Sequence, residues 1–529
     1  MTLSMRSLRT APSLAIAAVA LAACRSTPVT RPAPADHAPA YSVVPNPATI
    51  EVSRTDSFLV TPRTIVFVSA DASPEVEAIG TYAANLIASR AGATAQRLAS
   101  GTIPDSSVAL ALDSQRTQLG AEGYELTITK TQVRIVAAQP AGLFHGVQTF
   151  RQLLPIAVEH QAGYQRRLIA PVAHVVDVPR YEWRGAMLDV ARHFLPAEDV
   201  KRFVDLLALY KLNRLHLHLA DDQGWRIEIK SWPNLTAVGG QTAIGGARAG
   251  FYTQEQYADI VAYARSRYIT VVPEIDMPGH INAALMSYPD LKCDRVPPEP
   301  FTIVGGSKNT LCTTRDSVYT FVGDVVREIA ATAPTPYFHI GGDEVSSLTK
   351  EQYRSFIERV EGVVNSAGPR MIGWGEIAPA NIQPRTIVQY WTRDSSVIQA
   401  QRGGMLILSP GPHAYLDMKY DSTTTIGLKW AGMINLRTAY DWDPAALIPG
   451  VNASSILGLE APLWAETLLT RQDYEYLAFP RLAAIAELAW SSPARIGWDG
   501  FRARMQVQGA RLAALGVNFA RVPGVNWGW

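Results

Sequence analysis

The sequence predicts a (β/α)8 barrel that follows a smaller α+β domain. From Trp183 onward, short apolar segments alternate with longer segments of helical spacing, which is the pattern of βα units around a parallel sheet. Eight strands in a region of about 350 residues favour a closed barrel. An open, doubly wound sheet is the alternative, but no Gly-rich nucleotide loop follows any of these strands. The strand candidates are 185–189, 214–218, 270–273, 337–340, 371–373, 386–389, 405–408 and 455–459.

The smaller domain is predicted between Tyr41 and Val175. Its strand candidates, which are rich in β-branched and aromatic residues, are 64–68, 124–128 and 133–136. Its helix candidates, which have helical spacing, are 75–91 and 142–154. We place this domain at residues 41–176 and the barrel at 177–529. No group of residues in the small domain suggests catalysis, so we expect it to pack against the barrel.

The first residues have the features of an export signal. Arg6 and Arg9 give a positive region, and Leu14 to Ala23 give an apolar region. This apolar region is shorter than the roughly 20 residues that span a bilayer. A cleaved signal is therefore favoured over an anchor helix.

The end of this region predicts lipidation. Residues 21–24, Leu-Ala-Ala-Cys, resemble the bacterial lipobox, in which the cysteine is lipidated and becomes the mature N-terminus. We therefore expect a signal peptide over 1–24, a lipid on Cys24, and a bacterial periplasmic or cell-envelope location. Cleavage by an ordinary signal peptidase after Ala23 is the alternative. Residues 25–40 are rich in Pro, Ala, Thr and Arg, which suits a flexible linker.

Composition excludes few functions. The chain is 47% hydrophobic and 18% charged, which is ordinary for a soluble globular protein. A net charge of +1 gives no electrostatic case for nucleic acid, which usually requires a basic patch. Membrane association is expected only through the N-terminal lipid. The 12 Trp residues suit sugar binding, although Trp is also common in protein cores.

Two adjacent acids follow the predicted strand 337–340. Asp343 and Glu344 come directly after Gly341 and Gly342. On a continuing strand their side chains would point to opposite faces. Glycine tolerates backbone angles that other residues avoid, so a break here would let both acids reach one pocket. The alternative is that these acids cap the N-terminus of a helix.

Polar and aromatic residues follow the other predicted strands as well. In a barrel, the carboxyl ends of all strands lie at one rim, where catalytic groups collect. A purely structural role would scatter these residues over both ends. The set expected at this rim is Asp189, Arg192, Asp222, His280, Asp343, Glu344, Trp374, Trp391, Tyr415, Asp417, Trp464 and Glu466.

Four motifs in these segments resemble glycoside hydrolase family 20, the β-N-acetylhexosaminidases. Residues 339–344 match that family's His-x-Gly-Gly-Asp-Glu signature. The resemblance covers the chain from Arg180 to the C-terminus, with the motifs in the family's order. The other three matching segments are 211–226, 272–280 and 461–466.

The resemblance implies an exo-acting, retaining β-N-acetylhexosaminidase that needs no cofactor and no metal. In the family, the sugar's own 2-acetamido oxygen attacks the anomeric carbon, so these enzymes are an exception among glycosidases. By position, Glu344 is the general acid and then the base, and Asp343 orients the acetamido group. Tyr415 matches the residue that donates to the acetamido oxygen. The expected partner is an amino-sugar oligosaccharide or glycoconjugate with terminal β-linked GlcNAc or GalNAc.

The resemblance also implies a set of substrate-binding residues. Arg184 and Glu466 match the pair that holds hydroxyls at the non-reducing end. Asp417 would add a polar contact, and a cap of a neighbouring turn is the alternative for this residue. Three Trp residues match the family's aromatic walls around the N-acetyl methyl and the sugar face, namely Trp374, Trp391 and Trp464. Trp430 is a weaker member of this set and is also expected near the acetamido pocket.

An aspartate and His280 are expected to form a relay that orients Glu344 and tunes its pKa. Sequence leaves open whether Asp221 or Asp222 is that aspartate, and we prefer Asp222. A zinc site formed by His216 and His218 with Asp222 is an alternative, because both imidazoles would face one side of a strand. The family needs no metal, so we expect none.

The remaining cysteines, Cys293 and Cys312, are expected to form a disulfide because an exported protein folds in an oxidising compartment. Two other functions stay open at this point. One is a carbohydrate-binding protein without turnover. The other is a retaining glycosidase in which Asp343 or Glu344 is a covalent nucleophile.

Overall fold

The computed structural model describes residues 41–88, 95–98, 103–159, 167–392 and 395–528. The signal peptide, the linker and Cys24 lie outside these residues, so the expectations about them stay predictions. Among the described residues, no helix has both the length and the apolarity to cross a bilayer.

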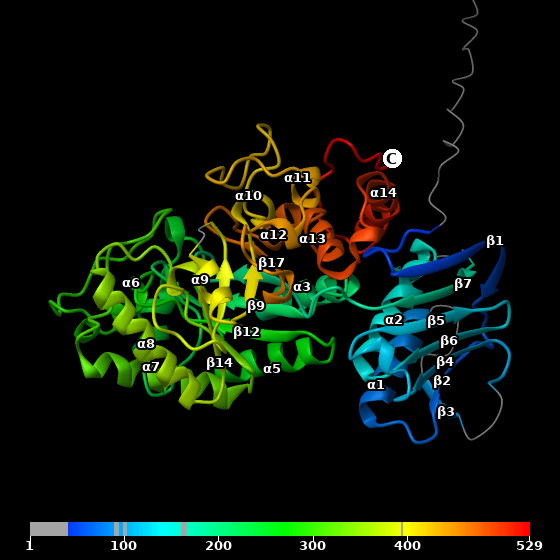
Figure 1. The fold of residues 1–529 in the computed structure, drawn as a ribbon, viewed down its shortest axis with the longest axis horizontal. Coiled ribbons are helices and arrows are strands. Elements are labelled where there is room, and N and C mark those ends of the chain that lie inside the picture. The colour runs from blue at the N-terminus through cyan, green and yellow to red at the C-terminus, as the bar shows by residue number, and fades with distance from the viewer. Residues whose placement is uncertain (1–40, 89–94, 99–102, 160–166, 393–394, 529) are drawn as a thin grey trace, which may run out of the picture. The chain divides into compact units, whose positions relative to one another are not determined.

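The N-terminal part is a seven-stranded sheet with helices α1 (Pro74–Ile87) and α2 (Pro140–Leu153) packed on it (Figure 1). The strand order is β1-β7-β5-β6-β4-β2-β3, antiparallel from β1 to β6 and parallel from β6 to β3. This confirms the expected α+β domain. The strands are β1 Thr49–Leu59, β2 Ile65–Ser69, β3 Ala95–Leu98, β4 Ser107–Leu112, β5 Tyr124–Ile128, β6 Gln132–Ala137 and β7 Ile169–Asp177.

The second part is a closed barrel of eight parallel strands, which confirms the predicted fold. Each predicted strand is present, with ends that differ by a few residues. The largest difference is in the last strand, which continues to Leu463. The strands are β8 Trp183–Asp189, β9 Arg214–His218, β12 Thr270–Glu274, β13 Tyr337–His339, β14 Arg370–Trp374, β15 Ile387–Tyr390, β16 Leu406–Leu408 and β17 Ile456–Leu463.

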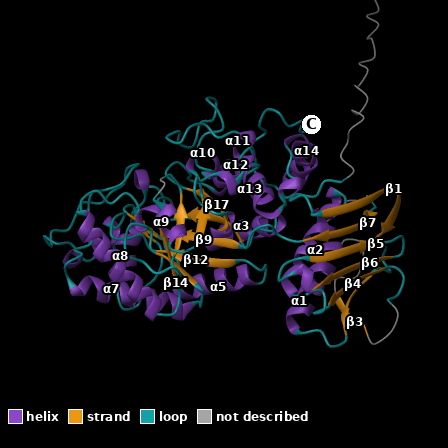
Figure 2. Cartoon of the chain, in the orientation of Figure 1, coloured by secondary structure: helices purple, strands orange, loops and turns teal. Residues whose placement is uncertain are grey.

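Helices surround the barrel strands (Figure 2). Three of the longer ones begin at capping boxes, in which Thr253, Thr349 or Thr470 accepts a backbone N–H from the third helical residue. The side chain of that residue, a Gln in the first two and an Asp in the last, accepts the backbone N–H of the threonine. The longer helices are α3 Ala197–Leu209, α5 Gln254–Arg265, α7 Asp316–Thr332, α8 Lys350–Ser366, α12 Arg471–Ala478, α13 Arg481–Trp490 and α14 Trp498–Ala514. The short ones are α4 Asn234–Ala237, α6 Asn282–Ser287, α9 Ser396–Gln401, α10 Gly411–Ala414 and α11 Leu436–Tyr440.

Two features shape the rim at the carboxyl ends of the barrel strands. The small hairpin of β10 (Ala220–Asp221) and β11 (Gly224–Trp225) follows β9. A long loop follows β12, and a disulfide between Cys293 and Cys312 closes part of it, as expected. This disulfide-closed loop (residues 293–312) returns to the rim, where Ser307 binds Asp222.

Buried ion pairs join the small domain to the amino ends of the barrel strands. Arg184, the second residue of strand β8, is fully buried and donates to Glu122 Oε1 at 2.7 Å and Oε2 at 2.9 Å. Lys211 Nζ lies 3.0 Å from Asp177 Oδ2, and both side chains are buried. Buried charges are tolerated when they are paired in this way.

We predict that Glu122→Ala destabilises the fold, because it leaves the Arg184 guanidinium buried without its carboxylate. Breaking a buried pair from one side typically costs about 3–5 kcal/mol. The expected result is a clearly lower thermal midpoint, with activity retained at low temperature, in a calorimetric scan of both proteins. Glu51→Ala is the control, because Glu51 is an exposed carboxylate on β1 of the same small domain. An unchanged midpoint in Glu122→Ala would contradict the structural role of the pair.

Candidate active site

A cavity of about 470 Å³ opens at the carboxyl ends of the barrel strands. It brings together most of the residues that the sequence placed at this rim. Among the predicted site residues, those that line it are His280, Asp343, Glu344, Trp391, Tyr415, Trp430, Trp464 and Glu466.

The two acids lie on a loop that leaves the barrel after β13. Gly341 (φ +64°) and Gly342 (φ +96°) have backbone angles that favour glycine, and Glu344 is also left-handed (φ +55°). A Cβ on Gly341 would lie 1.9 Å from Asp276 Oδ1, so the close approach itself requires glycine. The break lets both carboxyl groups reach the cavity. The helix-cap alternative is wrong, because the next helix, α8, begins only at Lys350.

Asp343 is mostly buried, and its Oδ1 has no hydrogen-bond partner among the described residues. Burial raises the pKa of Asp343, and a carboxyl oxygen of Asp276 lies within 4.8 Å of a carboxyl oxygen of Asp343. The pKa of Asp276 is raised well above its usual value by burial and by the charge of Asp343. The two carboxyl groups therefore favour a state in which one is protonated and the other is ionised, as is usual for close carboxylates.

Glu344 is the more exposed acid, with 58% of its side chain accessible. Its Oε2 lies 3.5 Å from His280 Nε2, and this contact is the main cause of a lowered Glu344 pKa. Burial alone would lower the pKa of His280, but Asp221 and Glu344 outweigh it and raise that pKa well above its usual value. The imidazolium is therefore favoured and faces the acid.

The aspartate that binds His280 is Asp221, so the preference for Asp222 was wrong. His280 Nδ1 lies 3.2 Å from Asp221 Oδ1 but 3.8 Å from Asp222 Oδ2. Asp222 instead accepts from Ser307 Oγ at 2.8 Å and from Asn282 N at 3.0 Å. Adjacent residues at the hairpin turn send their side chains in different directions. Asp222 thus anchors the disulfide-closed loop.

Arg184 does not reach the cavity, so its assignment to the substrate was also wrong. It lies near the amino end of β8, and five residues of strand at about 3.3 Å each separate it from the carboxyl end. Arg192, which follows β8 at the rim, lines the cavity instead. Its guanidinium lies 2.8 Å from Asp221 Oδ2 and 4.9 Å from the Trp464 ring centre. The sequence indicated this position for Arg192, because the residue comes just after the predicted strand 185–189 and was therefore expected at the rim.

Aromatic side chains line one side of the cavity. The Trp391 and Tyr415 rings stack with centres 6.3 Å apart, and Trp430 meets Tyr415 edge-on at 5.3 Å. The predicted site residue Trp374 does not line the cavity. It is buried, and its ring centre lies 5.8 Å from that of Trp464, which does line it. Trp430 is 53% exposed, which places it at the mouth of the cavity.

Two further carboxylates offer unpaired acceptors. Glu466 Oε2 and both carboxyl oxygens of Asp417 are buried without a hydrogen-bond partner in the described part of the chain. Burial raises the pKa of both groups. Buried polar atoms without partners are rare in proteins, and these acceptors suit a ligand that brings hydroxyl donors.

Comparisons with known proteins agree with this site. The model of "Glycosyl hydrolase family 20, catalytic domain" matches residues 181–493, and "Glycosyl hydrolase family 20, domain 2" matches residues 40–177. The chain belongs to glycosyl hydrolase family 20. It is a glycoside hydrolase of the β-N-acetylhexosaminidase class.

Family 20 relatives cover nearly the whole chain. A beta-N-acetylhexosaminidase of Cellulomonas fimi is 41% identical and covers 92% of this chain and 98% of its own length. The family 20 enzyme of Streptomyces coelicolor A3(2) superposes with a TM-score of 0.87 at 42% identity, over 92% of this chain and 99% of that one. A mutant beta-hexosaminidase of Streptomyces plicatus, in complex with its product GlcNAc, has the same TM-score at 43% identity, over 94% and 99%.

The three residues of the zinc alternative do not form one group, because His216 Nε2 and His218 Nδ1 meet at Glu274 Oε2, at 3.0 and 2.6 Å, and not at Asp222. His216 Nδ1 lies 2.8 Å from Glu460 Oε1, and His218 lies between Glu274 at 2.6 Å and Asp221 at 2.8 Å. Asp222, the third residue of that alternative, binds the disulfide-closed loop instead. These carboxylates explain the two imidazoles as members of a buried charge network.

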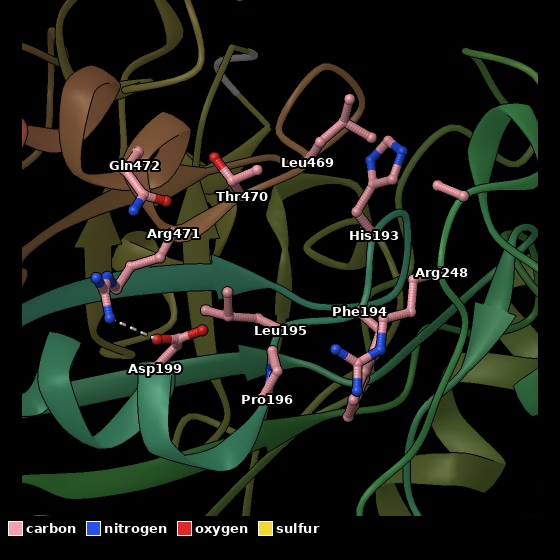
Figure 3. Close-up of a pocket in the computed structure, with 11 residues that line it drawn as sticks. His193, Phe194, Leu195, Pro196, Asp199, Arg248, Leu469, Thr470, Arg471 and Gln472 are labelled. Atoms are coloured by element: carbon pink, nitrogen blue, oxygen red, sulfur yellow. Dashed lines mark hydrogen bonds and ion pairs between the residues drawn. The ribbon is translucent and has the colours of Figure 1, made fainter.

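A second cavity of about 480 Å³ contains none of the predicted site residues (Figure 3). It is lined by residues that follow Arg192 and Glu466 in the chain, including His193 and Leu469. Its one carboxylate, Asp199, is paired with Arg471 at 3.2 Å. This cavity therefore lacks the paired acids that glycoside hydrolysis uses.

Proposed function

We propose that this hydrolase removes terminal, non-reducing, β-linked GlcNAc or GalNAc with retention of configuration, by substrate-assisted catalysis. The observation that carries the proposal is the pair of acids at the cavity. Asp343 presents a buried oxygen that has no hydrogen-bond partner within the described part of the chain, and Glu344 lies beside it, half exposed and facing His280. One acid is placed to bind an acetamido N–H, and the other is placed to exchange a proton with the leaving group or water.

In the first step, the substrate's acetamido oxygen attacks the anomeric carbon while the glycosidic C–O bond breaks. Glu344 gives its proton to the departing oxygen. Asp343 accepts the acetamido N–H and stabilises the positive charge of the resulting oxazolinium ring, while the Tyr415 hydroxyl donates to the acetamido oxygen. In the second step, Glu344 takes a proton from water, which opens the ring at the anomeric carbon. Two displacements at that carbon give retention.

The cavity supports this reaction mainly by positioning. Trp391 and Trp464, which line the cavity, are proposed as apolar walls for the acetamido methyl and the sugar face, and Trp374 is proposed to support them from its buried position against Trp464. Holding the acetamido oxygen next to the anomeric carbon makes the attack intramolecular, and effective molarities for such reactions can reach about 10^5 M or more. Proton transfer by a placed carboxyl typically contributes about 10^2- to 10^4-fold.

Arg192, Glu466 and Asp417 are proposed to hold the hydroxyls of the non-reducing end. Arg192 is tied to Asp221 and faces the same cavity as Glu466, whose Oε2 has no partner among the described residues. Residues that close the site on this side would make the enzyme exo-acting. Val304 and Trp430, both exposed at the mouth, would contact the leaving group.

The test compares 4-nitrophenyl N-acetyl-β-glucosaminide with the matching β-glucoside, using protein that lacks residues 1–24. We expect fast release from the first substrate and none from the second, because the glucoside has no acetamido nucleophile. Equal release from both would indicate an enzyme nucleophile and would overturn the proposed mechanism.

The pH dependence of kcat/KM should have its maximum in the acid range. Asp343 must be ionised to accept the N–H, and burial raises its pKa above 3.8, so activity falls as pH drops through that pKa. Glu344 must be protonated to act as the acid, and His280 lowers its pKa below 4.5, so activity falls as pH rises through that pKa. A pH–rate profile on the disaccharide substrate checks this, and a maximum above pH 7 would contradict it.

We also propose that the chain is exported and anchored by a lipid on Cys24. The lipobox-like residues 21–24 support this, and so does the disulfide between Cys293 and Cys312, which suits an oxidising compartment. In a bacterial host fed an alkyne-labelled fatty acid, the full-length chain should become labelled and fractionate with membranes. Cys24→Ala should abolish both, and labelling that survives this change would contradict the assignment.

A further inference from the structure

A fully buried carboxylate below the cavity takes no part in the steps above. Glu274 is the last residue of β12, and its two oxygens bind different partners. Oε1 accepts from the Trp374 indole Nε1 at 2.9 Å, and Oε2 accepts from His218 Nδ1 at 2.6 Å. Ring nitrogens of His216 and His339 also lie 3.0 Å from these oxygens.

Through Oε1, Glu274 fixes the orientation of Trp374, the buried indole that the proposed function places behind the acetamido pocket. Trp374 is 1% exposed and packs against Trp464. Packing alone restricts the indole plane, but the hydrogen bond also selects which edge of the ring faces the barrel axis. A flipped indole would present a different surface to the Trp464 ring, which lines the cavity.

Through Oε2, Glu274 begins a series of contacting side chains that ends at the acid Glu344. The members between them are His218, Asp221 and His280. His218 Nε2 lies 2.8 Å from Asp221 Oδ2. Asp221 Oδ1 lies 3.2 Å from His280 Nδ1, and His280 Nε2 lies 3.5 Å from Glu344 Oε2. Carboxylates and imidazoles alternate along this series, so each group orients the next one.

We propose that Glu274 is a positioning residue that holds Trp374, behind the acetamido pocket, and the proton-transfer group, Glu344, in register with each other. The inference rests on the proposed function and deepens it, because it joins the two halves of the reaction through one carboxylate. The charge states agree with it. Burial would raise the pKa of Glu274, but His218, His339 and His216 outweigh it and lower that pKa well below its usual range. The carboxylate is therefore ionised.

The barrel supplies a matched control in Glu460. This residue is also fully buried, accepts from an indole, Trp183 Nε1, at 2.9 Å, and lies 2.8 Å from His216 Nδ1. Its hydrogen bonds do not reach Trp374, His218 or Asp221 in the described structure. Glu274→Gln and Glu460→Gln thus remove the same charge from the same core. Only Glu274 is itself a member of the series of groups that ends at Glu344, and Glu460 meets that series only through His216.

The experiment measures kcat/KM for two N-acetyl-β-glucosaminides, the 2,4-dinitrophenyl glycoside and the disaccharide, and the Kd of a thiazoline analogue of the oxazolinium ring. Misplacement of catalytic groups by about 1 Å can cost about 10^2-fold in rate. For Glu274→Gln we expect a loss of about 10- to 100-fold on the activated glycoside, a larger loss on the disaccharide, and weaker thiazoline binding. For Glu460→Gln we expect both kcat/KM values and the thiazoline Kd to change by less than about 3-fold, because this variant leaves the contacts that position Trp374 and Glu344 in place.

A pH profile gives a readout that a packing defect would not move. The charge of Glu274 is among the causes that raise the pKa values of Asp343 and Asp276. Glu274→Gln should therefore shift the acid limb of kcat/KM to lower pH. The imidazoles of His216, His218 and His339 surround Glu274, and a change in their charge could also move the acid limb. Glu460→Gln also removes a carboxylate next to His216, so its pH profile shows how far a change at that imidazole alone shifts the acid limb.

If Glu274→Gln does not fold, Trp374→Phe and His218→Asn separate the two contacts. Trp374→Phe should weaken thiazoline binding most, and His218→Asn should slow the disaccharide most. The proposal is overturned if folded Glu274→Gln keeps both rates and the thiazoline Kd within 2-fold, if Glu460→Gln matches its losses, or if neither single-contact variant shows its expected effect. Failure of the proposed function would be seen separately, as glucoside hydrolysis by the unchanged enzyme.

Discussion

Glu344→Gln should abolish the hydrolysis of substrates with poor leaving groups while the fold survives. The amide cannot give a proton to the departing oxygen, and the acid's contribution to such reactions is about 10^2- to 10^4-fold. The side chain is 58% exposed on a loop, so the change removes no core contact. We expect kcat/KM on a natural disaccharide to fall by about this factor, and a 2,4-dinitrophenyl glycoside, which needs no acid, to lose far less in the first step.

The second step offers an independent check of Glu344. Without the carboxylate base, water attacks the oxazolinium ring slowly, but azide needs no base. Added azide should therefore accelerate turnover of the dinitrophenyl glycoside by Glu344→Gln and give the β-glycosyl azide, and it should not accelerate the unchanged enzyme. Full activity of the variant on the disaccharide would refute the assignment of Glu344.

Asp343→Asn should slow every acetamido substrate, whatever its leaving group. The variant replaces the acceptor of the N–H with a neutral amide and removes the charge that stabilises the oxazolinium ring. Removing one pre-organised electrostatic contact typically costs about 10^2- to 10^3-fold in kcat. Because Asp343 acts on the acetamido group, we expect similar losses for dinitrophenyl and disaccharide substrates, unlike the pattern of Glu344→Gln.

Two measurements distinguish this role of Asp343 from general damage. The thermal midpoint should not fall, because burial already raises the pKa of Asp343 and a neutral side chain suits its site. The acid limb of the pH profile should disappear, since the group that must ionise is gone. A loss confined to poor leaving groups would instead assign Asp343 to proton transfer and contradict the proposed division of roles.

The barrel and its acids could be predicted because their signals are local. Each strand is a short apolar run, and the acids follow two glycines whose positive φ angles the structure confirms at Gly341 and Gly342. The rim rule also placed Arg192 correctly, since a residue just after a barrel strand must lie at the carboxyl end. Arg184 was assigned by resemblance against that rule, and the structure contradicts the assignment.

By itself, the sequence determined the (β/α)8 barrel, the small domain before it, the family and the pair of acids, because periodicity and contiguous motifs record these features. Only the tertiary structure decided that Asp221 rather than Asp222 meets His280, that Arg184 binds Glu122, and that Glu274 joins Trp374 to His218. Each of these contacts joins residues from different strands or loops. Which of two neighbouring side chains reaches such a partner depends on the turn geometry and strand register that only the folded chain fixes.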